Sequence, residues 1–195
     1  MIQNNFSSKR LVLSSLACIG LSACVSTSPL APEVAPTAQA CPAGVPTGAT
    51  CLRGQDSASA HYLIVMPAKW TGVLVVHAHG GHSYGPTKTT RADEDIKRWS
   101  ITVRVGHAWA GSVFRQGGFA VTTAAEDTER VRRIFVEHVA KPKTTLLHGQ
   151  SWGAMVATRA GDGIVHIVCS VGNEGTGTDG KVSVKCAGAL NLSRA

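Results

Sequence analysis

Residues 144–154 read TTLLHGQSWGA, and this stretch decides the fold. The segment 144–148 has the pattern of a strand, and 154–160 consists of small or helix-tolerant residues. Between them, residues 149–153 (GQSWG) match G-x-S-x-G, with Ser151 at the centre. In this motif the serine occupies a tight strand-to-helix turn, because the two glycines remove side chains that would clash there. The helix that follows directs its N-terminus at the same point, which favours a developing negative charge.

A second glycine-containing stretch, His79-Gly80-Gly81, closes the apolar run GVLVVHAH at 72–79. Backbone N–H groups after such a strand, together with the N–H after the serine, can hold a carbonyl oxygen that gains charge. We therefore assign Gly81 and Trp152 as candidate oxyanion donors. The alternative is that the glycines serve only a tight turn.

Strand and helix patterns alternate along the rest of the chain. This order predicts an α/β fold, with a doubly wound, mostly parallel sheet and helices on both faces. The expected strands are 60–66, 72–79, 119–123, 144–148 and 163–171, and the expected helical stretches lie within 91–116 and at 126–138 and 154–160. Within the first helical stretch, the expected core residues are Trp99, Val103, Trp109, Val113 and Phe114.

Residues 60–160, and within them HAHGG, AAEDTERVRRIF and LLHGQSWGA, resemble the α/β-hydrolase superfamily. The combination looks like secreted bacterial serine hydrolases of the esterase and peptidase type. The resemblance implies acyl transfer on a small ester or amide substrate, with no cofactor. Ser151 would attack the carbonyl, form an acyl-enzyme and release it to water.

The chain departs from that family after the serine. The family order is serine, then an acid, then histidine. After Ser151 the sole histidine is His166, and the only acid between them is Asp162. His166 falls in the expected strand 163–171, which favours a structural residue over a catalytic base. We therefore expect a hydrolase domain at 41–195 that is truncated, or altered in reading frame, after the turn that carries Ser151. Whether this domain catalyses hydrolysis is left open by the sequence. A non-catalytic binding module or a degenerate remnant is the alternative.

A different chemistry is open at residues 77–82, which read HAHGGH. His77, His79 and His82 resemble the zinc loop of metallo-β-lactamase-type hydrolases, with His148 and Asp162 as further possible ligands. Glycine stands at position 81, where that family has an aspartate. The helical pattern between residues 117 and 142 also suits a doubly wound sheet better than a β-sandwich. Our main prediction therefore contains no metal.

The N-terminal residues have the pattern of a targeting segment. Lys9 and Arg10 precede an apolar run at 11–21, which is too short to span a bilayer as a mature helix. The run ends in LSAC at Cys24, which resembles the lipobox of bacterial lipoproteins and implies acylation of Cys24 and a membrane anchor. Valine at position 25 favours, by resemblance, the outer membrane facing the periplasm. Ordinary secretory cleavage is the alternative.

These features divide the chain into a signal peptide at 1–23, a Pro/Ala/Ser/Thr-rich tether at 24–40 and one domain at 41–195. The composition, 44% hydrophobic and 16% charged, suits a globular core. The net charge is +7. Its densest cluster, Arg130, Arg132 and Arg133, is expected on a solvated helix face. Without interleaved aromatic residues it does not indicate nucleic acid as a partner.

The cysteines fit an exported protein. Cys41 and Cys51 flank a short Pro/Gly-rich loop, so in an oxidising compartment we expect a disulfide between them. Cys169 and Cys186 are either a second pair or two buried thiols. No C-x-x-C pattern occurs, so a structural zinc site is not indicated.

Overall fold

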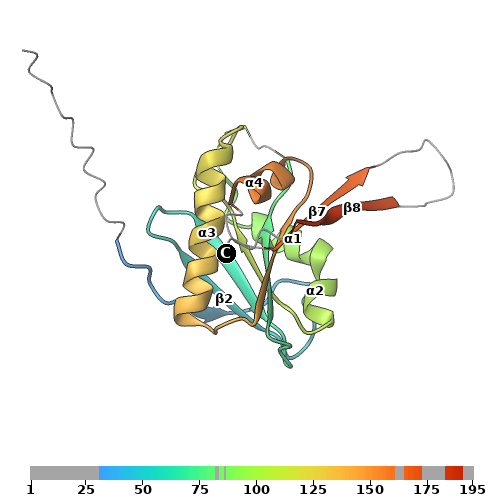
Figure 1. Ribbon diagram of the computed structural model, residues 1–195. Helices are drawn as coiled ribbons and strands as arrows, with labels where there is room; N and C mark the ends of the chain where they lie inside the picture. The colour runs from blue at the N-terminus through green and yellow to red at the C-terminus, as the bar shows by residue number, and fades with distance from the viewer. Residues whose placement is uncertain (1–30, 82–83, 86, 161–164, 173–182, 191–195) are drawn as a thin grey trace, which may run out of the picture. The chain divides into compact units, whose positions relative to one another are not determined.

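The computed structural model describes residues 31–81, 84–85, 87–160, 165–172 and 183–190 (Figure 1). In these ranges one eight-stranded sheet has the order β1-β2-β3-β5-β4-β6-β7-β8. The strands are β1 (Thr37–Gln39), β2 (Thr50–Gln55), β3 (His61–Met66), β4 (Val73–Ala78), β5 (Ala108–Ser112), β6 (Thr144–Gly149), β7 (Val165–Gly172) and β8 (Ser183–Leu190). The helices are α1 (Arg91–Trp99), α2 (Ile101–Arg104), α3 (Val121–His138) and α4 (Trp152–Ala160). The predicted α/β class is confirmed.

The sheet is mixed, which corrects the predicted mostly parallel arrangement. Its centre is parallel: β4 pairs with β5 and β6, and β6 pairs with β7. On either side the pairs are antiparallel, namely β1–β2, β2–β3, β3–β5 and β7–β8. The connections explain the difference. Helices link the central strands, whereas only residues 56–60 join β2 to β3, and so short a connection requires antiparallel neighbours.

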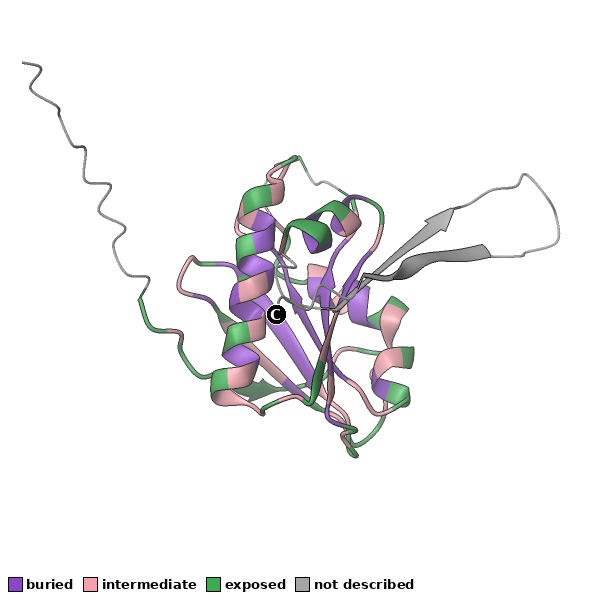
Figure 2. Cartoon of the chain, in the orientation of Figure 1, coloured by how far each residue is buried: buried purple, intermediate pink, exposed green. Residues whose placement is uncertain are grey.

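Helices pack on both faces of the sheet, because successive strand residues point to opposite sides. Ile64 and Val76 pack in one core cluster with residues of α3 and α4. Val65 and Val75 pack in a second cluster with residues of α1 and α2. In Figure 1, α3 and α4 lie together on one side of the strands, and Figure 2 shows buried residues along the sheet-facing side of α3.

Two predicted elements differ from the structure. The range 119–123 does not form a strand, because α3 begins at Val121 and buries Ala124 and Ala125 against the sheet. Tertiary burial outweighs the β propensity of these residues. Conversely, β5 lies within the stretch 91–116, where only helical segments were expected. All of its residues are buried, and its small side chains around Trp109 show no alternation of apolar and polar residues.

The first described residues belong to the domain rather than to a free spacer. The range 24–40, predicted as a tether, contains β1, which pairs with β2. Upstream of β1, the Glu33 carboxylate accepts hydrogen bonds from the N–H and hydroxyl of Ser57, at 2.8 and 2.7 Å. Cys24 and the predicted signal peptide lie outside the described residues. Within the described ranges, no helix is long and apolar enough to cross a membrane.

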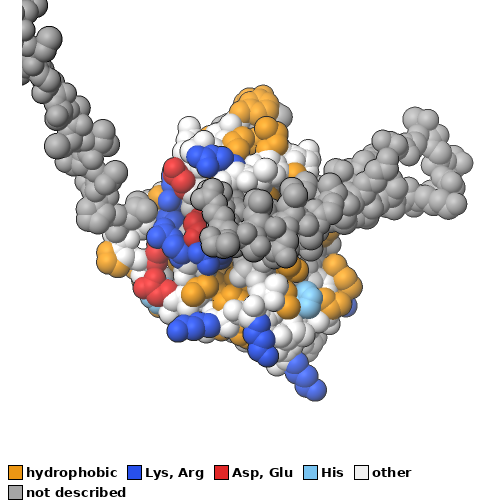
Figure 3. Space-filling view, viewed as in Figure 1, with side chains coloured by type: hydrophobic (Ala, Val, Ile, Leu, Met, Phe, Trp, Pro, Cys, Tyr) orange, Lys and Arg blue, Asp and Glu red, His pale blue; other side chains and the backbone are white. Residues whose placement is uncertain are grey.

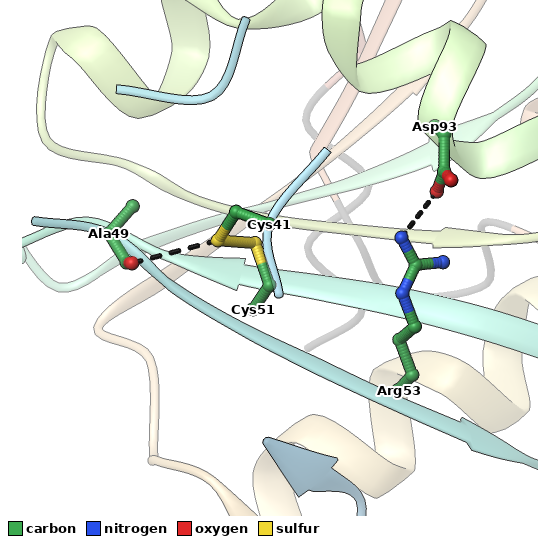
Figure 4. Close-up of a disulfide and its surroundings, with 5 residues drawn as sticks. All are labelled: Cys41, Ala49, Cys51, Arg53 and Asp93. Carbon is green, nitrogen blue, oxygen red and sulfur yellow. Dashed lines mark hydrogen bonds and ion pairs between the residues drawn. A yellow bond between two sulfur atoms is a disulfide. The ribbon is translucent and has the colours of Figure 1, made fainter. Parts of the chain in front are cut away.

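A disulfide joins Cys41 to Cys51 and closes the loop before β2 (Figure 4). Two residues further along β2, Arg53 Nη2 donates to Asp93 Oδ1 of α1 at 2.6 Å. The disulfide therefore fixes the start of the strand that carries this contact with α1. Cys169 and Cys186 are register partners of β7 and β8, and their side chains lie outside the described part of the structure.

The predicted basic face of α3 is partly wrong. Arg130 is 3% exposed and donates from Nε to Asp56 Oδ2 at 2.8 Å, and its Nη2 also pairs with Asp127. Arg132 pairs with Glu129 at 2.6 Å. A buried arginine needs a compensating carboxylate, and α3 carries one at the preceding turn. On the face shown in Figure 3, Lys and Arg side chains stand beside Asp and Glu side chains.

Candidate active site

Ser151 occupies the turn between β6 and α4 with a φ of 54°. The left-handed conformation costs a non-glycine residue about 1–2 kcal/mol, so the surrounding structure must hold it. Two backbone hydrogen bonds close the turn, from Gly153 N to Gln150 O at 2.8 Å and from Ala154 N to Ser151 O at 2.9 Å. Ser151 is exposed, and among the described residues no side chain hydrogen-bonds to its hydroxyl.

Both glycines of the motif are required by close backbone packing. A Cβ at Gly149 would overlap the carbonyl oxygen of Gly153. A Cβ at Gly153 would overlap the carbonyl oxygens of Ala78 and His79, which follow directly at the end of β4. Gly153 therefore brings the start of α4 into contact with the neighbouring strand, and the serine is presented above the sheet edge.

The loop after β4 lies against this turn. A Cβ at Gly80 would stand 2.6 Å from the carbonyl oxygen of Gln150, so only glycine fits. Gly81 has a φ of 75° and open space on its Cβ side. The predicted donor residues, Gly81 and Trp152, line the same small cavity. The structure thus brings the two glycine motifs together, although sixty-odd residues separate them in the sequence.

The cavity has a volume of about 70 Å³. Its apolar lining comes from Val113 and Phe114 after β5 and from Trp152 on α4. Lys88, Arg91 and Glu94 contribute charged side chains to the same lining. His79, Thr87, Gln116, Gly117 and Gly118 complete the lining. Such a small, partly apolar pocket beside candidate oxyanion donors suits a short acyl group.

His79 forms part of the cavity wall and is 6% exposed. Its ring stacks on Phe114 with 4.2 Å between centroids, and it is tilted against Trp152 at 6.2 Å. Burial lowers the pKa of His79 to about 4, against a weaker opposing influence of Asp95. The imidazole is therefore neutral at pH 7. Its Nδ1 lies 3.3 Å from Gly80 O, and a hydrogen bond there requires the proton on Nδ1.

A pair of buried histidines, which the sequence analysis considered only as possible zinc ligands, lies on neighbouring strands below the site. His77 on β4 and His148 on β6 are register partners, and their Nδ1 atoms are 2.8 Å apart. One ring donates and the other accepts. Burial, and secondarily the electrostatic influence of the neighbouring His77 ring, lowers the pKa of His148 to about 3. Trp99 packs edge-on against His148 with 4.3 Å between centroids.

The pair extends toward α1. His77 Nε2 lies 3.9 Å from Asp95 Oδ1, too far for a hydrogen bond, and this buried nitrogen has no hydrogen-bond partner. Arg91 Nε lies 3.6 Å from the same oxygen. One feature of the sequence points to this pair: both histidines immediately precede the last residue of their strands, β4 and β6. Their pairing, however, depends on a register that residue spacing does not reveal.

The described residues do not form a set of zinc ligands, as the zinc alternative would require. His77 packs toward Trp99 and Trp109, whereas His79 stacks on Phe114, so the two rings belong to different clusters. Within the described ranges, no group of three or more His, Cys, Asp or Glu side chains could hold a metal ion. His82 and Asp162 lie outside those ranges.

The possible triad histidine can be placed only by its backbone. His166 lies on β7, next to Leu147 of β6 in the parallel register. This agrees with the strand expected at 163–171. The His166 side chain lies outside the described part of the structure.

Over about 60% of its length, the chain is similar in structure to solved α/β serine hydrolase esterases. An esterase of the bacterial hormone-sensitive lipase family is 20% identical, with a TM-score of 0.44, and the match covers 60% of this chain and 38% of that one. Esterase B from Lactobacillus rhamnosis is 18% identical, with a TM-score of 0.45, and the match covers 60% of this chain and 40% of that one. Acetyl xylan esterase 1 from Thermoanaerobacterium is 12% identical, with a TM-score of 0.39, and the match covers 65% of this chain and 49% of that one.

The match thus spans about two fifths of the length of the first two of these esterases. No family model matches the chain, and no curated protein sequence matches it.

Proposed function

We propose that this chain carries the nucleophile and oxyanion site of a serine hydrolase that acts on small carboxylic esters or amides. One observation carries the proposal. Ser151 is exposed in a left-handed turn at the start of α4, and close backbone contacts at Gly80 and Gly153 hold the loop after β4 against that turn. Strained residues of this kind concentrate at functional sites, because the surrounding structure must maintain them.

The proposed reaction begins with attack of Ser151 Oγ on the substrate carbonyl carbon while a base takes the hydroxyl proton. The carbonyl oxygen becomes an oxyanion, and the N–H groups of Gly81 and Trp152 donate to it. Loss of one such donor costs roughly 3–4 kcal/mol of transition-state stabilisation. The alcohol or amine leaves with the proton, and water then hydrolyses the acyl-enzyme. The proposal leaves the base to a group outside the described residues.

A second candidate is a binding module without turnover. The observation that favours it is that no described side chain hydrogen-bonds to Ser151 Oγ. Without a base, serine is a weak nucleophile. In that case the cavity beside Trp152 would still hold a small acyl-like ligand, but the serine would not become acylated.

Labelling of the full chain with a fluorophosphonate probe separates the two candidates. The proposed hydrolase is expected to label in the wild type and in Ser100→Ala, a control serine between α1 and α2, but not in Ser151→Ala. An EDTA-treated sample should label equally, whereas loss of ester turnover in EDTA would favour the zinc alternative. A folded wild-type chain that neither labels nor turns over p-nitrophenyl acetate would leave the binding module as the function.

For the N-terminal region we propose acylation of Cys24 and attachment to the bacterial cell envelope, at the outer membrane facing the periplasm. The support is the apolar run that ends in LSAC at Cys24. Metabolic labelling with an alkyne fatty acid should modify the wild type and not Cys24→Ala. The variant should also leave the membrane fraction. Equal labelling of both proteins would exclude this anchor.

A further inference from the structure

The carbonyl group of Gly80 accepts a hydrogen bond from a cationic side chain. Arg91, the first residue of α1, donates from Nη2 to Gly80 O at 3.0 Å. The guanidinium is 30% exposed, and its other partners are Glu94 at 3.5 Å and Asp95 at 3.6 Å. Its buried Nε has no hydrogen-bond partner. The contact with Gly80 O is therefore the shortest polar contact of this side chain.

This carbonyl belongs to the peptide unit whose N–H is the proposed oxyanion donor. In a planar trans peptide, the C=O of one residue and the N–H of the next point in opposite directions. Fixing Gly80 O on the Arg91 side therefore directs the Gly81 N–H to the other side. A charged donor on the oxygen also polarises the peptide, which makes its N–H a stronger donor.

The loop needs such a support because glycine does not fix its own conformation. Gly81 has a positive φ, and no atom approaches the position of its absent Cβ within 4 Å. Consecutive glycines can rotate the peptide unit at little steric cost. On the Arg91 side, Asp95 is 5% exposed and close to His77, so the arginine is backed by a buried carboxylate on its own helix.

We propose that Arg91 is a positioning residue, which orients the Gly80–Gly81 peptide so that the Gly81 N–H faces the oxyanion. The inference rests on the function proposed above. Arg91 touches no reacting atom in this scheme and acts through the peptide unit. Its effect should therefore appear both in the electronic state of this peptide and in turnover.

The sequence allows a direct spectroscopic test, because only two Gly-Gly steps occur in the chain, at 80–81 and 117–118. Labelling with 1-¹³C-glycine and ¹⁵N-glycine gives an HNCO spectrum of the full chain with these two correlations. We expect the Gly80 carbonyl carbon to lie downfield of that of Gly117. In Arg91→Met it should move upfield by more than the 117–118 peak, which reports on the shared cavity lining. Arg104→Met, an exposed arginine on α2, should move neither peak. An unmoved Gly80 peak in Arg91→Met would overturn the proposal.

Kinetics provides the second readout. With p-nitrophenyl acetate, Arg91→Met should lower kcat about 10- to 100-fold and change KM less than about threefold, since the lost interaction acts on the transition state. Arg91→Lys should recover part of kcat. If Arg91→Met does not fold, the kcat of Arg91→Lys and the chemical shift of the wild-type Gly80 carbonyl carbon still test the proposal. A moved peak with unchanged kcat would confirm the hydrogen bond and refute its role in catalysis. A wild type without turnover would refute the proposed hydrolase, while the Gly80 peak would still report on the contact.

Discussion

Gly80 and Gln150 meet backbone to backbone, with only 2.6 Å between the position of a Cβ on Gly80 and the Gln150 carbonyl oxygen. This contact joins the loop after β4 to the turn that carries Ser151. Arg98 Nη1 also donates to Gln150 Oε1 at 2.8 Å, so α1 contacts the same turn. The geometry of the site therefore depends on a residue with no side chain.

Gly80→Ala should separate the loop from the turn. Because the neighbouring atom is backbone, the loop must move, and the Gly81 N–H moves with it. We expect fluorophosphonate labelling to slow about 10- to 100-fold, less than the roughly 100- to 1,000-fold loss of a whole oxyanion donor, because the N–H is displaced rather than removed. Gly85→Ala is the matched control, since its Cβ would meet nothing within 4 Å and only its φ of 96° is strained. Equal labelling rates in Gly80→Ala and wild type would show that the contact does not position the donor.

The size of the cavity predicts a preference for short acyl chains. Its volume of about 70 Å³ is less than half of the roughly 150 Å³ of an apolar cavity that admits benzene. We expect kcat/KM for p-nitrophenyl esters to be highest for acetate or propionate and to fall with each added pair of methylenes. Val113→Ala, which shortens a lining side chain, should move the optimum to a longer chain. Val103→Ala removes the same atoms from the core away from the cavity and should not. A flat profile from acetate to octanoate would exclude this pocket as the acyl site.

Two buried neutral histidines predict loss of stability in mild acid. The pKa of His79 is lowered to about 4 and that of His148 to about 3, mainly by burial. In the unfolded chain both titrate near 6.5, so below this pH the unfolded state binds more protons than the folded state. Their contribution is complete above about pH 6.5 and decreases toward the folded pKa values, at up to about 1.4 kcal/mol per pH unit for each histidine.

Urea unfolding between pH 7 and pH 5 measures this slope, a range in which most carboxylates stay ionised. His79→Gln should remove the contribution of one histidine from the slope. A free energy of unfolding that does not change from pH 7 to pH 5 would contradict the buried neutral state of both rings.

The sequence predicted the parts of this molecule that depend on neighbours in the chain. The turn at Ser151 follows from residues 144–154 alone, because a strand, two glycines and a helix specify it locally. The loop at Gly80 was predicted for the same reason. The parallel centre of the sheet was predicted because helices alternate with strands there. The antiparallel strands before β4 were not predicted, because residue spacing did not reveal that β1 pairs with β2.

The contacts that the sequence analysis missed join residues that are distant in the sequence. His77 and His148 meet because β4 and β6 are in register, and Arg91 reaches Gly80 only after α1 folds back over the strand ends. Arg130 was expected in solvent because its neighbours in the sequence are charged. Asp56, far away in the sequence, makes its burial possible. Pairing between distant polar groups leaves no periodic pattern for sequence analysis to detect.

Arg130 provides a test of whether pairing between polar groups distant in the sequence stabilises the fold. It is buried between Asp56 and Asp127, so Arg130→Met should leave Asp56 without its cation, while Asp127 keeps Arg115 at 2.7 Å, and should lower the free energy of unfolding by about 3–5 kcal/mol. Part of the loss should be recovered by Asp56→Asn in the same chain, which removes the unpaired charge while keeping the shape. Arg133→Met, one turn away and exposed, should change stability by no more than about 0.5 kcal/mol. Equal urea midpoints for Arg130→Met and Arg133→Met would mean that Arg130 contributes no more than a surface arginine.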